Sequence, residues 1–206
     1  MWNYEKRLQY PVNIKTPNAK IAQFIMSQYG GPDGEIGASM RYLSQRFTMP
    51  NRTAVAVLND VGTEELAHLE MVSTIVHQLT RGLSMEEIEK SGFGPYYIDH
   101  TVGVWPQAAG GVPFNACEFQ SKGDPVTDLF EDLAAEQKAR ATYDNILRVV
   151  RDIPEVADLS IRALTARAKH PVKIPESENM LMALLQYTIQ KIQLPNGGEL
   201  FSRLYR

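Results

Sequence analysis

The sequence lacks several features that would place it in a specialised class of protein. Its single cysteine, Cys117, excludes a disulfide within the chain, and we interpret it as a buried, reduced thiol of an intracellular protein. No stretch approaches the roughly 18 apolar residues of a membrane span. The N-terminal segment MWNYEKRLQYPV also lacks the apolar core of a signal peptide. We therefore expect a cytoplasmic protein that does not enter a membrane.

A basic excess is missing as well. The chain has 21 Lys and Arg against 24 Asp and Glu, a formal net charge of -3. Nucleic-acid binding normally requires a basic face, so this class is disfavoured. With 206 residues, 44% of them hydrophobic, the chain is long enough for one globular domain over 1–206 with a substantial core.

The pattern of apolar residues and helix breakers predicts an all-α protein. An extended arm over 1–18 leads into a helical segment that is interrupted by GGPDGE at 30–35, and a long segment rich in Gly and Pro covers 82–123. Short links join the first helix to the second and the third to the fourth, and the long segment joins the second to the third. This is the wiring of a ferritin-like four-helix bundle with a long crossover between helices 2 and 3. The predicted helices cover 19–29 and about 32–47, then 52–81, 125–150 and a fourth that begins after Pro154.

The predicted helix over 52–81, which is the second long helix of the bundle, carries two polar residues on its apolar face. Counting in steps of three and four residues gives Leu58, Val61, Glu65, His68, Val72 and Ile75. Burying an ionised carboxylate is costly unless it is paired or binds a cation. Glu65 and His68 are therefore candidate metal ligands, although one such pair also occurs by chance on solvated helices.

The other predicted helices repeat this anomaly. Glu136 lies in the apolar stripe of the third helix, Glu35 aligns with Ser39 and Tyr42, and His170 projects from the fourth. Ferritin-like dinuclear proteins take one Glu from each of two helices and Glu-x-x-His from each of the other two. Carboxylate and imidazole ligands suit Mn, Fe or Zn. We expect four other acidic residues of these helices to be surface charges, namely Glu64, Glu70, Glu131 and Asp132.

Four longer motifs carry a resemblance to a known family. The segments QYGGPDGEIGASMRYLSQRF, DVGTEELAHLEMVSTIVHQLT, GVPFNA and GDPVTDLFEDLAAEQKARATY occur in this order. They resemble the manganese catalases, in particular a short branch that includes spore-coat manganese catalase-like proteins. The likeness extends from residue 1 to about residue 165.

The resemblance implies two manganese ions per chain and the dismutation of hydrogen peroxide to dioxygen and water. Glu35 would bind one metal ion, Glu65 would bridge the pair, and His68, Glu136 and His170 would complete the ligand set. Tyr42 matches an outer-sphere tyrosine of the family, although its position alone fits an ordinary core tyrosine equally well. The resemblance also implies a homohexamer and allows a location in the spore coat.

The fourth helix departs from the family pattern. The family has an acid/base Glu three residues before the last His, where this chain has Arg167, and Pro171 directly follows His170. Arginine stays protonated at neutral pH, and proline disfavours continuation of the helix. The tail over 169–206 has lost the resemblance, although 176–193 has the pattern of a short helix.

Three functions remain open at this point. The first is a manganese catalase whose turnover is weakened by the missing Glu. The second is a structural spore-coat protein that keeps the bundle without catalysis. The third is a diiron oxidase or iron-storage protein, since iron shares these ligands.

Overall fold

The structure is a computed structural model that describes residues 5, 7–9, 11–94, 106–108 and 110–150. The predicted fourth helix, with Arg167 and His170, and the divergent tail lie outside these residues. The described part is helical, apart from one isolated bridge between Gln107 and Pro113. Its elements are α1 (Ala19–Gly30), α2 (Glu35–Gln45), η1 (Arg46–Thr48), α3 (Arg52–Thr80), α4 (Met85–Ser91), η3 (Ala116–Glu118) and α5 (Pro125–Val149).

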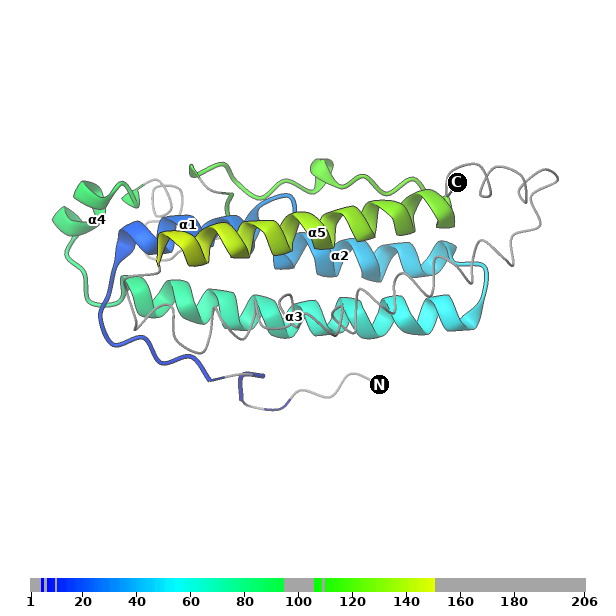
Figure 1. The fold of residues 1–206 in the computed structure, drawn as a ribbon, viewed down its shortest axis with the longest axis horizontal. Coiled ribbons are helices and arrows are strands. Elements are labelled where there is room, and N and C mark those ends of the chain that lie inside the picture. The colour runs from blue at the N-terminus through cyan, green and yellow to red at the C-terminus, as the bar shows by residue number, and fades with distance from the viewer. Residues whose placement is uncertain (1–4, 6, 10, 95–105, 109, 151–206) are drawn as a thin grey trace.

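The long helices lie side by side along one axis (Figure 1). Helices α1 and α2 follow each other end to end and run antiparallel to α3, while α5 packs against both α1 and α2. The all-α prediction is confirmed. No helix of the described residues is long and apolar enough to cross a membrane.

Side-chain caps fix where these helices begin. Asn18 accepts a hydrogen bond from the backbone N–H of Ile21, and Asn51 accepts one from Ala54 at 2.9 Å. Asp124 caps α5, whose first residue is Pro125, a position where the missing N–H of proline is not needed. These signals explain why the starts of α1, α3 and α5 were predicted correctly.

The break between α1 and α2 is longer than predicted. Gly31 donates to the carbonyl of Ser27, and Gly34 donates to that of Gly31, so α2 begins at Glu35 and not near Pro32. A Cβ atom on Gly31 would lie 2.3 Å from the Ser27 oxygen, and only glycine fits there. Because of this tight turn, Glu35 occupies the first turn of a helix, where the dipole favours negative charge. The end also differs, since α2 stops at Gln45 and continues as η1.

The crossover contains a helix that the sequence did not predict. Helix α4 begins with a capping box between Ser84 and Glu87, and its buried Ile88 packs with Phe93 against the bundle. Seven residues are too few to show a helical period. Later in the crossover, Cys117 is exposed, which contradicts the expectation of a buried thiol. It belongs to the short η3, which packs no buried residue into the core.

The interior divides into two hydrophobic cores. The first joins α1, the second half of α3 and the end of α5, and it includes Ile25, Met71, Ile75, Leu79 and Ile146. The second joins α2 and the first halves of α3 and α5, and it includes Tyr42, Ala54, Leu58, Val61 and Leu129. The arm contributes Ile14 to the first core, where its backbone N–H donates to the Gln78 side chain.

Helices α2 and α3 approach closely at Gly62. Ser39 donates a 2.7 Å hydrogen bond from its hydroxyl to the Gly62 carbonyl. A Cβ atom at position 62 would lie 2.8 Å from Cγ of Leu43 and 3.2 Å from Cβ of Tyr42. The absence of a side chain therefore sets the spacing of the two helices.

We predict that Gly62→Ala destabilises the protein by about 1–3 kcal/mol, the usual effect of overpacking a tight interface. Urea unfolding followed by circular dichroism measures the change. Gly94→Ala is the matched control, because a Cβ atom at Gly94 would meet nothing within 4 Å. Equal unfolding free energies for the two variants would show that the interface relaxes without penalty.

Candidate metal centre

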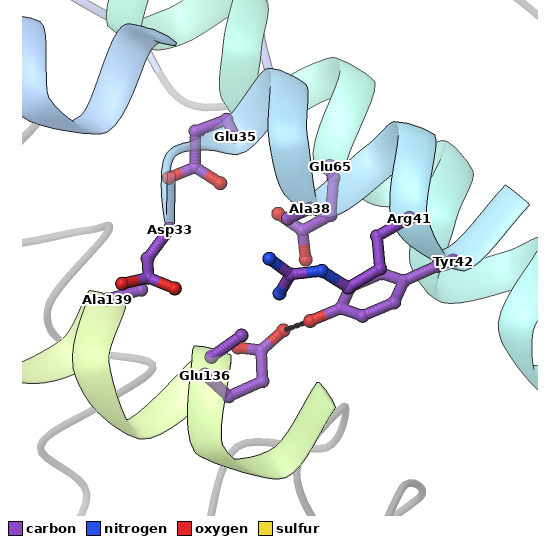
Figure 2. Close-up of a pocket in the computed structure, with 9 residues that line it drawn as sticks. Asp33, Glu35, Ala38, Arg41, Tyr42, Glu65, Glu136 and Ala139 are labelled. Atoms are coloured by element: carbon purple, nitrogen blue, oxygen red, sulfur yellow. Dashed lines mark hydrogen bonds between the residues drawn. The ribbon is translucent and has the colours of Figure 1, made fainter. Parts of the chain in front are cut away.

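A layer of acidic residues separates the two cores. Glu35 comes from the first turn of α2, Glu65 from the middle of α3 and Glu136 from the middle of α5. Their side chains converge on one small cavity (Figure 2). Glu35 and Glu65 are only 6% and 5% exposed, so the cluster is shielded from bulk water. The structure thus brings together three of the predicted ligands from three different helices.

His68 completes this cluster from the same helix as Glu65. Its Nδ1 atom lies 2.7 Å from Oε2 of Glu65 and 3.7 Å from Oε2 of Glu35. One donor atom from each of these three residues lies within 4.8 Å of the other two. Glu65 and His68 therefore project from the same face of α3, as their spacing of three residues predicted.

The charges of this cluster are strongly coupled. Burial alone would raise the pKa of Glu35, but hydrogen bonds and charge from His68 outweigh it and lower the pKa. Burial raises the pKa of Glu65 well above its usual value. Burial would lower the pKa of His68, yet the adjacent Glu65 and Glu35 raise it well above the ordinary histidine value. A divalent cation would supply the positive charge that these groups otherwise obtain from protons.

Tyr42 reaches across the cavity from α2 to α5. Its hydroxyl donates a 2.5 Å hydrogen bond to Oε1 of Glu136 (Figure 2). Burial, followed by the charge of Glu136, raises the pKa of Tyr42 well above 10, so the phenol keeps its proton. The position predicted for an outer-sphere tyrosine is thus occupied by a hydroxyl that holds a candidate ligand.

Tyr143 makes the reciprocal contact, which sequence reasoning missed. Its hydroxyl, on α5, donates to Oε1 of Glu35 at the start of α2. Burial, together with the charge of Glu35, raises its pKa well above 10. Tyr143 lies seven residues, about two helical turns, after Glu136, so both fall on one face of α5, and this spacing was the available signal. Each helix therefore holds the carboxylate of the other through a tyrosine.

Asp132 contradicts the expectation of a surface charge. It is fully buried on α5, and neither of its carboxylate oxygens has a hydrogen-bond partner among the described residues. Burial raises its pKa to about 8. Asp132 lies near Gln45 and Arg41 of α2, so a second row of α5 faces this helix, and the neighbouring Asp128 accepts from the backbone of Lys122 and Gly123. Glu131, by contrast, is partly exposed beside Lys138.

The donor set fits a hard or borderline divalent cation. Carboxylate oxygens and one imidazole, buried and clustered, are ligands typical of Mn, Fe or Zn, and no thiolate lies among the cavity-lining residues. Carboxylates presented by the inner faces of a helical bundle are typical of the ferritin-like metal-binding proteins.

Comparison with known proteins specifies this class further. The family model "Manganese containing catalase" matches residues 1–173. Protein CotJC of Bacillus subtilis is 45% identical over 88% of this chain and 95% of its own length. A probable manganese catalase of Clostridium acetobutylicum is 30% identical over 74% of this chain and 68% of its own. The chain belongs to the family of manganese-containing catalases.

The fold is shared with solved structures of this family. The crystal structure of KatB, a manganese catalase from Anabaena, superposes with a TM-score of 0.65 and 27% sequence identity. The match covers 94% of this chain and 77% of that one. The predicted ferritin-like bundle is thereby confirmed, whereas Arg167 and His170 lie outside the described residues.

We predict that Tyr143→Phe weakens manganese binding by about 10- to 100-fold, because partners that orient a metal ligand typically contribute this much. Competition with a fluorescent chelator measures the affinity. Tyr29→Phe is the matched control, since Tyr29 packs on the first core and has no hydrogen bond to a carboxylate. An affinity unchanged in Tyr143→Phe would show that Glu35 is positioned by its backbone alone.

Asp132 predicts a pH-dependent stability. Its pKa is about 8 in the folded protein and about 4 in the unfolded chain, so the folded state holds one more proton between these values. Stability should therefore fall as pH rises through this window, by up to about 1.4 kcal/mol per unit. Asp132→Asn should flatten this slope in urea unfolding between pH 5 and 7.5. Asp60→Asn, at an exposed site on α3, should not.

Proposed function

We propose that this protein binds two manganese ions per chain and dismutates hydrogen peroxide to dioxygen and water. The observation that carries the proposal is the buried Glu35–Glu65–His68 cluster, which faces Glu136 between two apolar cores. These four residues would hold the ions, with Glu65 as the bridge, and His170 stays the predicted fifth ligand. When bound, the manganese pair supplies the exchange of two electrons with peroxide.

The residues around the ions have separate roles in this proposal. Tyr42 and Tyr143 keep their protons and orient Glu136 and Glu35 by hydrogen bonds. A small cavity of about 20 Å³ lies between the carboxylates and Tyr42, and its volume favours a ligand not much larger than water. Hydrogen peroxide meets the size requirement because it is only slightly larger than water. Its reaction also transfers protons, and a site with little water limits where these protons can go.

The sequence also supports a reduced turnover. At the position where the family resemblance places a general acid/base Glu, this chain has Arg167, which holds its proton at neutral pH. General acid/base groups contribute about 10²- to 10⁴-fold to enzymatic rates. We propose a turnover below that of manganese catalases by a factor within this range.

We predict that the manganese-supplemented protein contains about two manganese ions per chain by elemental analysis and releases oxygen from hydrogen peroxide. Glu65→Gln should lose most of the metal and the oxygen release, because it removes the bridging charge. Glu131→Gln, a partly exposed residue on α5, is the matched control and should retain both. A wild-type protein without manganese would contradict the proposal, and iron in its place would favour the diiron alternative.

A second candidate is a structural role in the spore coat. The identity of 45% to protein CotJC exceeds the 28–30% to proteins named as manganese catalases of Bacillus subtilis and Clostridium acetobutylicum. The sequence of the predicted fourth helix also departs from the family pattern at Arg167 and Pro171. Together these observations favour a bundle that keeps its metal for assembly. We propose that the assembly is a homo-oligomer, namely a hexamer. Two bound manganese ions with negligible oxygen release would support this role over catalysis.

A further inference from the structure

The cavity between the acidic residues is also lined by a buried cation. Arg41 is 1% exposed, and it shares the cavity with Glu35, Glu65, Glu136 and Tyr42. In Figure 2 its guanidinium points from α2 into the space that the carboxylates surround. None of the sequence patterns placed this residue in the site.

Two contacts hold the guanidinium without neutralising it. Nη2 donates a 3.2 Å hydrogen bond to the carbonyl of Pro32, and Cζ lies 6.0 Å from the centre of the Phe119 ring. Both partners are uncharged, so they orient the side chain and leave its charge in place. Phe119 belongs to the crossover, so the crossover contributes one of the two contacts of the guanidinium.

The remaining hydrogen-bond donors of Arg41 are unused. Nε and Nη1 are buried and have no hydrogen-bond partner in the described part of the chain, and no described carboxylate forms an ion pair with the guanidinium. The nearby Asp132 senses its charge, which lowers the pKa of that acid, but its oxygens are equally unpartnered. A buried cation with free donors destabilises the fold by several kcal/mol unless something accepts from it.

We propose that Arg41 makes this cavity a binding site for a small anion, with hydroperoxide, which leaves its proton in the bulk water before it enters, as the natural occupant of the proposed reaction. The proposal rests on the proposed function, because divalent cations must first neutralise the three surrounding carboxylates. The free N–H groups of Arg41 then donate to one end of the anion, and the cavity of about 20 Å³ is on the scale of an anion of two or three atoms. Arg41 would thus favour the charged form of peroxide next to the metal ions.

Azide is a suitable probe, since it is a small anion that is not consumed. Its dissociation constant is measured by calorimetric titration of the manganese-loaded protein, whose metal content is determined on the same samples. Arg41→Gln should weaken azide binding by at least about 10-fold, the usual contribution of a hydrogen bond to a charged group. Arg41→Lys should restore part of the affinity. Arg140→Gln, which removes a partly exposed charge from α5, should leave it unchanged.

The outcomes separate this inference from the proposed function. Azide affinity that depends on Arg41, in a loaded protein that releases no oxygen, supports the anion site and overturns the catalase function. Oxygen release with an azide affinity that is equal in wild type and Arg41→Gln overturns the anion site alone. A wild-type protein that shows no saturable azide binding also overturns it. Thermal unfolding of each variant shows whether Arg41 contributes to stability as well.

Discussion

The burial of negative charge inside an apolar bundle is the constraint on which this structure depends. Three carboxylates and an imidazole occupy the layer between two hydrophobic cores, where water has little access to Glu35 and Glu65. Such groups destabilise a fold unless positive charge and hydrogen bonds compensate. The protein provides both, through the contact of Glu65 with His68 and through two tyrosine hydroxyls. The pKa values of Glu65 and His68 are both raised well above their ordinary values, so these groups hold protons in the absence of a cation. A bound cation would supply this positive charge instead.

The backbone contributes to this compensation through its breaks. If α1 and α2 were one continuous helix, Glu35 would lie in its interior, where peptide N–H groups are already used. The turn through Gly31 and Gly34 instead places Glu35 at a helix start, next to the positive end of the dipole. At Gly62, the lack of a side chain lets α3 approach α2 closely. The glycines at positions 31, 34 and 62 therefore help to determine where the carboxylates of α2 and α3 lie.

The sequence predicted the long elements and most of the site for local reasons. Helices α3 and α5 were located to within about one residue because their caps and apolar stripes lie in contiguous sequence. Glu65, His68 and Glu136 were chosen as candidates because polar residues in an apolar stripe conflict with the pattern around them, and Glu35 was chosen because it completes the ferritin-like set. Whether they bind metal is a separate question, which the proposed metal analysis addresses.

What the sequence could not predict depends on packing between distant segments. Asp132 was misassigned because α2 packs near it, and no local pattern encodes that contact. Arg41 was missed because only the fold brings the Phe119 ring to its guanidinium. Tyr143 looked like an ordinary core residue, since only the fold brings its hydroxyl to Glu35. In each case, the missing information is the identity of a neighbour far along the chain.

The reciprocal tyrosines have a mechanical consequence for the bundle. Tyr42 ties α2 to the middle of α5, and Tyr143 ties α5 to the start of α2, so the two bonds fix the register of these helices along their common axis. A slip of one helical turn, about 5.4 Å, would break both bonds together. The two hydroxyls therefore hold Glu35 and Glu136, which lie on separate helices, at a fixed separation.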